Sequence, residues 1–290
     1  MHHEGIKAIV PRPLWPAAGA CLKTWRWIQT SRPAVTIMRY LARPDTAAWR
    51  WETEPLAPSG KLCVFVTYSP AGQIPERAIR HAAIWRNAGY EVLFVIALDE
   101  YSSHPTIPFG HAICRENKGH DFAAWSRALT QVPLNQCNIV ATVNDSVFTN
   151  DKLTSAIKRA EADPADVVGF TECREYRWHL QSYALMFKGN CVRSEVFRRF
   201  WQPRIGSRRH VILTYEIQLA RTMCRAGYDL TTLYPLKAAD NPTIHHWPEL
   251  LELGYPYLKR SEFPRKREAW LPLIAAHGFD VGFILHERPI

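Results

Sequence analysis

The sequence lacks several patterns that would assign a function directly. Its seven cysteines are scattered singly without a CxxC pair, so we expect neither a disulfide framework nor a zinc knuckle, and a reducing cytosol suits them. The motifs GxxxxGK[ST], GxGxxG, GxSxG and HExxH are absent, which disfavours P-loop NTPases, dinucleotide-binding folds, α/β-hydrolases and zincin proteases. The longest uninterrupted apolar run, residues 92–98, is far shorter than the ~18 residues of a membrane helix.

The composition is that of an ordinary globular protein. The chain has 290 residues, of which 47% are hydrophobic and 22% charged, and this length suits one large domain with terminal additions. The net charge of +9 admits nucleic acid, an anionic membrane surface or a phosphorylated substrate as partner. No RNP-like strand or DNA-binding motif occurs, so we expect no nucleic acid. Residues 14–22 faintly resemble an export signal but are interrupted by Pro16, so we expect a cytoplasmic protein.

Residues 1–60 differ in composition from the rest of the chain. They hold eight Arg or Lys residues against four acids, and five of the eleven tryptophans. Basic residues interleaved with Trp suit a lipid headgroup layer. The alternative is a helical extension that packs on the main domain, and both remain open. We therefore divide the chain into an N-terminal extension, 1–60, and a main domain, 61–290.

After Gly60, apolar strands and amphipathic helices alternate regularly. We expect strands at 61–68, 91–98, 111–114, 137–143 and 166–170, and helices at 76–87, 121–129 and 154–161. A strand at 180–188 and helices at 194–201 and 211–225 should follow. Such alternation predicts βαβ units, and therefore a single α/β domain with a mainly parallel sheet flanked by helices.

The first polar cluster, RENKGHDFAAW at 115–125, follows a strand and opens a helix. Asn117 and Gly119 lie in the loop, and Asp121 is at the expected N-cap. Such a loop can offer backbone N–H groups to an anion or ribose, with Arg115 and Lys118 adding positive charge. The alternative, a capped helix with an Asx turn, explains Asp121 but not the whole run.

The second cluster is Asn144-Asp145-Ser146, which ends a buried strand. Asn, Asp and Ser are ordinary turn formers, so a simple turn is one explanation. A carboxylate at the carboxyl edge of a parallel sheet can instead hold Mg²⁺ or Mn²⁺ against a diphosphate. One acid is a weak cage, and the residues alone leave both explanations open.

The remaining candidates lie further along the chain. In a strand, His179, Gln181 and Tyr183 would share one face and could line a sugar site together with Ser182. The alternatives are a core histidine with its hydrogen bonds satisfied, or an exposed strand edge. Glu216 lies in an apolar helical stretch and could serve as a general base if burial raises its pKa, or could simply face solvent. Trp247, in the run His245-His246-Trp247, could close over the sugar or pack in a turn.

Six motifs in this order resemble the rhamnan synthesis F family, bacterial glycosyltransferase-like proteins of cell-surface polysaccharide assembly. They are RENKGHDFAAW (115–125), VNDSVF (143–148), HLQSYALMFK (179–188), FRRFW (197–201), VILTYEIQLA (211–220) and HWPELLELGYPYLKR (246–260). The resemblance extends over about residues 61–260. It implies a GT-A-like (Rossmann-like) domain that transfers a sugar, such as rhamnose, from a nucleotide-sugar donor to a lipid-linked or polysaccharide acceptor, as in lipopolysaccharide O-antigen. An anionic membrane surface would then be a natural partner.

The same resemblance implies roles for individual residues. Asp145 would touch the metal ion and the diphosphate, although the usual GT-A pattern has two acids here, so metal dependence stays open. Tyr68, Asn117 and Asp121 would border the nucleotide, and residues 179–182 would line the sugar pocket. Glu216 would be the base of an inverting transfer, with Arg115 and Lys118 stabilising the leaving group if no metal binds. The alternative function is a non-catalytic carbohydrate-binding or assembly subunit.

Overall fold

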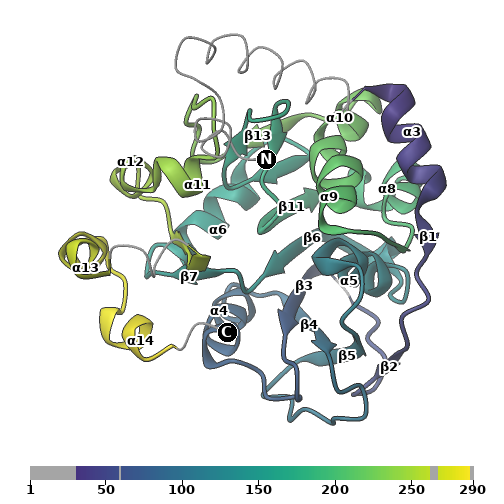
Figure 1. Ribbon diagram of the computed structural model, residues 1–290, viewed down its shortest axis with the longest axis horizontal. Coiled ribbons are helices and arrows are strands. Elements are labelled where there is room, and N and C mark those ends of the chain that lie inside the picture. Colours follow the sequence, from purple (N-terminus) through teal and green to yellow (C-terminus); the bar gives the residue numbers. More distant parts are fainter. Residues whose placement is uncertain (1–30, 59, 262–266, 288–290) are drawn as a thin grey trace, which may run out of the picture.

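The fold is built on an eight-stranded sheet. The structure is a computed structural model that describes residues 31–58, 60–261 and 267–287. The strand order is β13-β8-β11-β6-β3-β4-β5-β2 (Figure 1). In chain order these strands are β2 (Trp49–Trp51), β3 (Gly60–Tyr68), β4 (Glu91–Leu98), β5 (His111–Glu116), β6 (Cys137–Asn144), β8 (Val167–Gly169), β11 (Ala184–Lys188) and β13 (Leu230–Thr232).

Six of these eight strands run in the same direction, and β11 and β2 run against their neighbours. β3 lies between β4 and β6 in parallel pairing, with Leu62 opposite both Glu91 and Val140. Parallel neighbours require crossover connections, and helices supply them here. The predicted α/β fold, a mainly parallel sheet flanked by helices, is therefore confirmed.

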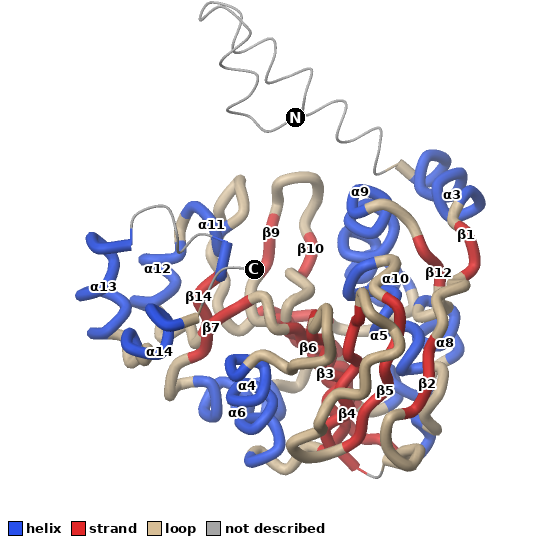
Figure 2. Tube along the Cα trace, turned by 60° about the horizontal axis from the view of Figure 1, so that its bottom comes forward, coloured by secondary structure: helices blue, strands red, loops and turns tan. Residues whose placement is uncertain are grey.

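Helices cover both faces of the sheet, and the alternation of side chains along β3 divides the core between them. Cys63 and Phe65 pack with α4 (Glu76–Asn87) and α6 (Leu153–Ala162). Leu62 and Val64 point to the opposite face, which is covered by α5 (His120–Leu129), α8 (Glu195–Phe200) and α10 (Ile217–Arg225) (Figure 2). Because both faces are covered, β3 and β4 are continuously apolar.

Shorter elements surround this sheet. Three two-stranded ladders pair β1 (Arg43–Pro44) with β12 (Arg204–Ile205), β9 (Glu172–Cys173) with β10 (His179–Leu180), and β7 (Val147–Thr149) with β14 (Tyr257–Lys259). The remaining helices are α3 (Arg32–Leu41), α7 (Asn190–Arg193), α9 (Arg208–Val211), α11 (Pro242–His245), α12 (Trp247–Glu252), α13 (Arg267–Ala276) and α14 (Val281–His286), with a 3-10 turn at Leu134–Gln136. None of the helices in the described ranges combines the length and apolar character that a membrane span requires.

We expected one continuous strand at 180–188, and this prediction was wrong. The structure has two short strands instead, β10 and β11, separated by a turn at residues 181–183. β10 pairs with β9, whereas β11 pairs with β6 and β8 in the main sheet. The chain must break between them because the two strands belong to different sheets, and this break places Ser182 at the tip of the turn.

Part of the expected N-terminal extension is integrated in the main sheet. β2 is its edge strand and pairs antiparallel with β5, with Trp49 opposite Arg115. The remaining early elements, α3 and β1, precede it. Residues 1–30, which carry much of the basic and Trp-rich text, lie outside the described residues.

A buried ion cluster fastens this early segment to the domain. The carboxylate of Asp45 accepts hydrogen bonds from the guanidinium of Arg115 at 3.1 and 3.2 Å, and Arg127 approaches the same group at 3.3 Å. The side chains of Arg115 and Asp45 are 1% and 0% exposed. Since two arginines share one carboxylate away from water, removal of Asp45 would leave buried positive charge unpaired.

We therefore expect Asp45→Ala to lower the free energy of unfolding by about 3–5 kcal/mol in urea denaturation. The matched control is Glu195→Ala, which removes an exposed carboxylate that pairs with Arg199 at 2.7 Å and should cost less than about 1 kcal/mol. Equal losses in the two variants would show that burial adds nothing to the Asp45 cluster.

Candidate functional site

The strands β3, β4, β5 and β6 deliver polar residues to one edge of the sheet, because parallel strands end on the same side. Tyr68 ends β3, Asp99 follows β4, and Asn117 follows β5. The Tyr68 hydroxyl donates to Asp99 Oδ2 at 2.5 Å, and Asn117 Nδ2 donates to Asp99 Oδ1 at 3.0 Å. These bonds lower the pKa of Asp99, with the Tyr68 hydroxyl contributing most. Asp99 was not among the predicted site residues, although it follows a buried strand just as Asn144-Asp145-Ser146 does.

The loop from β5 to α5 has an unusual backbone. Gly119, which precedes α5, and His120, the first residue of α5, both have positive φ, 81° and 60°. A Cβ on Gly119 would lie 2.7 Å from both Ala123 Cβ and Ile205 Cγ2, so only glycine fits between the helix and β12. A non-glycine residue with positive φ is uncommon, and such strain concentrates at binding sites.

The two basic residues of this loop have intramolecular partners. Arg115 is buried against Asp45, and its Nη1 donates to the carbonyl oxygen of Lys118 at 2.7 Å. The guanidinium of Arg115 therefore fixes the loop between β5 and α5 from its buried side. Lys118 is exposed, with its Nζ 2.6 Å from Glu116 Oε2.

The Asn144-Asp145-Ser146 turn connects several elements. Asn144 Oδ1 accepts from the backbone N–H and the hydroxyl of Ser146 at 3.1 and 2.6 Å, which makes an Asx turn. Asn144 Nδ2 donates to Asp121 Oδ2 at 2.7 Å. The segment is therefore a turn that also fixes the first acid of α5.

Three carboxylates influence one another at this edge. Burial, together with the charges of Asp145 and Glu216, raises the pKa of Asp121 to about 6, against the hydrogen bond from Asn144 and the charge of Arg208. Burial also raises the pKa of Asp145. Such clustering of perturbed acids is typical of functional sites.

Asp145 has close cationic neighbours. Its Oδ2 accepts hydrogen bonds from Thr67 Oγ1 at 2.9 Å and from Arg77 Nη2 at 3.0 Å. The charges of Arg77 and of Arg260 both favour its ionised form. Neither arginine was predicted as a site residue. Arg260 closes the last of the six motifs, whereas Arg77 is an ordinary helix residue by sequence and gives no signal.

Glu216 lies beside the 181–183 turn. Its Oε1 accepts from the hydroxyl of Ser182 at 2.9 Å and from the Ser182 backbone N–H at 3.4 Å. Glu216 is half-buried and ends a π-helical segment, Ile212–Glu216, inserted between α9 and α10. π-Segments of this kind occur frequently at functional sites.

The other predicted sugar contacts divide into two groups. Gln181 is buried, accepts from Thr171 Oγ1 at 2.7 Å and donates to Asn241 Oδ1 at 2.8 Å. His179 is also buried, with Nδ1 2.7 Å from the Arg177 carbonyl oxygen. The structure brings Ser182 to Glu216, whereas the side chains of Gln181 and His179 are both buried, at 4% and 5% exposed.

Trp247 does not lie at this site. It is 5% exposed within the hydrophobic core, and its ring lies 4.6 Å from that of Trp270. This packing favours the alternative, a packed turn, and closure of Trp247 over a sugar stays a prediction.

The residues around Asp145 do not fit the predicted divalent metal ion. One carboxylate oxygen is taken by Thr67 and Arg77, and a metal ion on the other oxygen would meet the like charges of Arg77 and Arg260. Within the described residues, no group of three His, Cys, Asp or Glu side chains is arranged to hold a metal ion. Mg²⁺ or Mn²⁺ dependence stays a prediction that this donor set does not favour.

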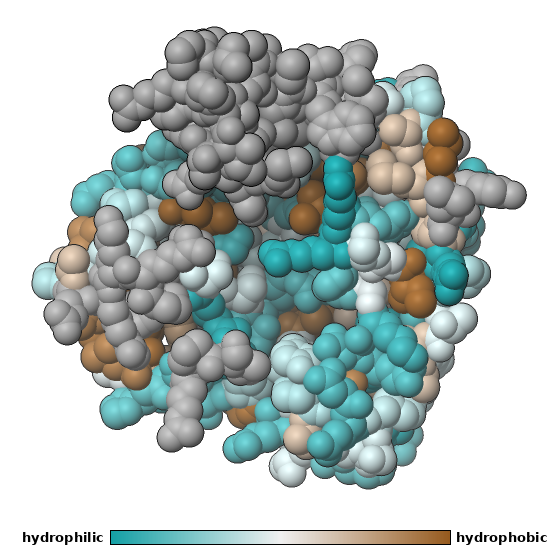
Figure 3. Space-filling view, in the orientation of Figure 1, coloured by the Kyte–Doolittle hydropathy of each residue, from teal (hydrophilic) through white to brown (hydrophobic). Residues whose placement is uncertain are grey.

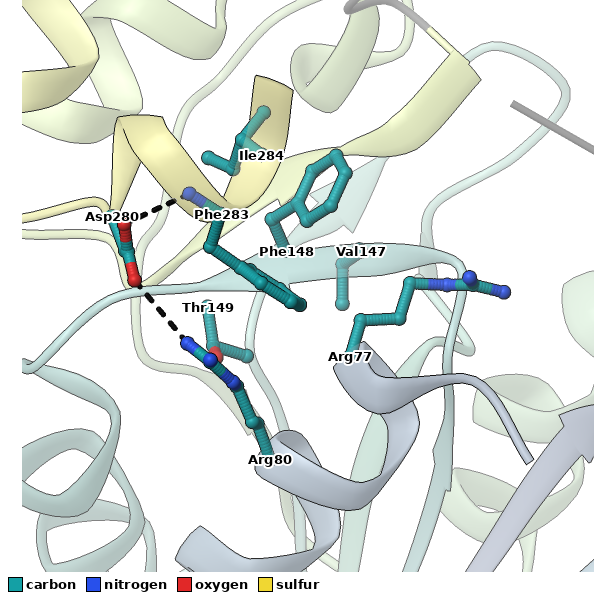
Figure 4. Close-up of a pocket in the computed structure, with 8 residues that line it drawn as sticks. All are labelled: Arg77, Arg80, Val147, Phe148, Thr149, Asp280, Phe283 and Ile284. Carbon is teal, nitrogen blue, oxygen red and sulfur yellow. Dashed lines mark hydrogen bonds and ion pairs between the residues drawn. The ribbon is translucent and has the colours of Figure 1, made fainter. Parts of the chain in front are cut away.

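Hydrophilic residues border the hollowed centre of the face in Figure 3. A separate cavity of about 60 Å³ lies between α4, β7 and α14 (Figure 4). Ligand pockets usually measure about 300–1,000 Å³, so this cavity is too small for a nucleotide sugar.

Residues 108–274, more than half of the chain, match the model of the family described as rhamnan synthesis protein F. The chain belongs to the rhamnan synthesis protein F family. The predicted resemblance is confirmed, and the family match includes Asp121, Asp145, Glu216 and Arg260. No curated protein matches the sequence.

Solved structures similar to this member of the rhamnan synthesis protein F family are distant. A glycosyltransferase involved in glycosylation of the major capsid of PBCV-1 is 12% identical, with a TM-score of 0.41 over 68% of this chain and 94% of its own. A protein described as a nucleotide-diphospho-sugar transferase from Desulfovibrio desulfuricans G20 is 12% identical, with a TM-score of 0.37 over 76% and 100%. A protein described as a glucose-1-phosphate thymidylyltransferase from Bacillus anthracis, in complex with sucrose, is 8% identical, with a TM-score of 0.38 over 62% and 87%. Likenesses this weak carry no argument about activity.

The raised pKa of Asp121 predicts a specific pH dependence. Because its folded-state pKa of about 6 lies above the ordinary value of about 4, the folded state retains a proton that the unfolded state releases. The free energy of unfolding should therefore fall as pH rises from about 4 to 6, and Asp121→Asn should reduce that fall. Denaturation of both proteins across this range measures the slope, and identical slopes would contradict the shift.

Proposed function

We propose that this protein is a glycosyltransferase that moves a sugar from a nucleotide-sugar donor to a growing cell-surface polysaccharide or lipopolysaccharide glycan. The observation that carries the proposal is Glu216, held by Ser182 at the carboxyl edge of the sheet, close enough for its charge to act on Asp121. Open α/β folds bind ligands at this edge. Membership in the rhamnan synthesis protein F family supports the same chemistry, with rhamnose as one candidate sugar.

In this proposal the donor lies across the strand ends. The nucleoside contacts Tyr68, Asp99 and Asn117, whose side chains already share hydrogen bonds. The diphosphate lies near the N-terminus of α5, where the helix dipole favours negative charge and exposed Lys118 adds a positive one. The sugar reaches toward the half-buried Ser182, which supplies a neutral hydroxyl group.

The proposed reaction is an inverting transfer. Glu216 accepts the proton of an acceptor hydroxyl, whose oxygen attacks the anomeric carbon. The bond from that carbon to the diphosphate oxygen breaks, and its electron pair leaves with the nucleoside diphosphate. Ser182 holds Glu216 by donating to Oε1, which leaves the second carboxylate oxygen for the acceptor.

A thermal-shift panel of dTDP, UDP, GDP and CDP tests the donor site. Ligand at a hundred times its dissociation constant should stabilise the fold by about 2.7 kcal/mol. A shift with one nucleotide would support a donor site and name its base. No shift with any of them would favour the alternative, a non-catalytic carbohydrate-binding or assembly subunit.

We expect Glu216→Gln to lower turnover roughly 100-fold or more, because the amide cannot accept the hydroxyl proton. Nucleotide binding should stay unchanged, since the proposal places Glu216 at the acceptor rather than at the nucleotide. The measurement is release of nucleoside diphosphate from the donor, with Glu252→Gln, an exposed acid of α12, as the control. Wild-type turnover in Glu216→Gln would remove the base assignment.

We also propose that the basic, Trp-rich N-terminal sequence brings the enzyme to acceptors at an anionic membrane surface. Replacing Lys23, Trp25, Arg26 and Trp27 together by alanine should weaken binding to vesicles that contain phosphatidylglycerol at least tenfold, at about 1 kcal/mol per basic residue. Substitution is preferable to truncation at Gly60, which would remove β2 from the sheet.

The control for vesicle binding is the double variant Arg198→Ala and Arg199→Ala, which removes two exposed cations of α8. This variant should bind the same vesicles as the wild type does. Unchanged vesicle binding by the N-terminal variant would contradict the membrane role.

A further inference from the structure

Arg260 lies directly beside the Asn144-Asp145-Ser146 turn. It follows β14, which pairs with β7, and its backbone N–H donates to the Ser146 carbonyl oxygen at 3.1 Å. The charges of Asp145 and Glu287 act on its guanidinium. Arg260 is half-buried. Within the described ranges, no hydrogen bond joins its guanidinium to another side chain. Arg260 is therefore a cation at the site whose donors are available.

Arg77, in contrast, is committed to two carboxylates. Its Nη2 lies 3.0 Å from Asp145 Oδ2 and its Nη1 lies 2.7 Å from Glu287 Oε2, and its side chain is 4% exposed. Arg77 is thus too enclosed to reach a ligand, but it neutralises Asp145 from below. This makes the carboxylate a poor attractor of a second cation.

Helix α14 holds this arrangement in place from the side. Arg80 of α4 lies 3.2 Å from Asp280 Oδ2, and its guanidinium lies 4.0 Å from the centre of the Phe283 ring. Asp280 also caps α14 by accepting from the Phe283 N–H at 2.9 Å. In Figure 4 the side chain of Arg77 extends away from Phe283. By fixing α14 against α4, these contacts place Glu287, which follows α14, beside Arg77.

The two guanidinium groups of Arg77 and Arg260 are close enough for like-charge repulsion. Burial lowers the pKa of Arg260, and the charge of Arg77 lowers it further. A bound anion would relieve that repulsion, whereas a divalent cation would add to it. The arginine guanidinium also matches phosphate geometry with two parallel donors.

We propose that Arg260 binds the diphosphate of the nucleotide-sugar donor, and that Asp145 positions the two arginines instead of holding a metal ion. The assignment rests on the proposed transferase function. As the bond between the anomeric carbon and the diphosphate oxygen breaks, the electron pair stays on that oxygen. The guanidinium of Arg260 stabilises the negative charge by hydrogen bonds and transfers no proton.

The test measures binding by isothermal titration calorimetry on the full chain. UDP, GDP, CDP and dTDP, and the matching nucleosides, are titrated in EDTA and in excess Mg²⁺ or Mn²⁺. The diphosphate that binds should do so equally well in EDTA. Arg260→Ala should weaken its binding on the order of tenfold to a hundredfold and leave binding of the nucleoside unchanged, whereas Arg260→Lys should recover part of the loss.

The matched control is Arg225→Ala, which removes an exposed arginine at the end of α10 and should bind like the wild type. Unchanged diphosphate binding by Arg260→Ala would overturn the assignment. Metal-dependent binding that Asp145→Asn abolishes would also overturn it, while leaving the donor site in place. Failure of the wild-type chain to bind any of the diphosphates would overturn the donor site itself. Two readouts use only the wild-type chain: the comparison of EDTA with metal, and the binding of any diphosphate. Both remain valid even if the Asp145 variant does not fold.

Discussion

Arg77 and Asp145 form an ion pair of 3.0 Å beneath the carboxyl edge of the sheet, with side chains that are 4% and 12% exposed. The pair joins α4 to the end of β6, and Glu287 adds α14 through the same guanidinium. Buried pairs of this kind contribute little net stability, but loss of one partner leaves a costly charge behind. The positions of the turn after β6, and of Arg260 beside it, therefore depend on this contact.

Three arginines near the strand ends differ in what they can reach. Arg115 is enclosed by Asp45 and the loop backbone, and Arg77 is enclosed by two carboxylates. Arg260 alone among these three keeps a partly open guanidinium. The sequence presents them as equivalent positive charges, whereas burial separates two structural cations from one that can bind a ligand.

Much of the architecture could be predicted from the sequence, because hydrophobic periodicity is a local signal. The helix at 76–87 and the strand at 91–98 match the structure residue for residue. Pairing between distant segments is not a local signal, so the split of 180–188 between two sheets and the inclusion of β2 were missed. For the site, too, local signals could be predicted and contacts between distant segments could not. A strand end pointed to Asp145 and a helix start to Asp121, but Arg77 could be identified only from the structure, where α4 lies beside the turn that follows β6.

The π-segment Ile212–Glu216 sets the rotational phase of the helix that carries the candidate base. Each residue of an α-helix turns the chain by about 100°. One added residue in a π-turn therefore shifts everything after it by that angle relative to an uninterrupted α-helix. The apolar side of α10, with Leu219 and Met223, faces the core, while Glu216 faces Ser182. The extra residue lets one continuous helix satisfy both directions, so the spacing between α9 and α10 is as specific to the site as the identity of the acid.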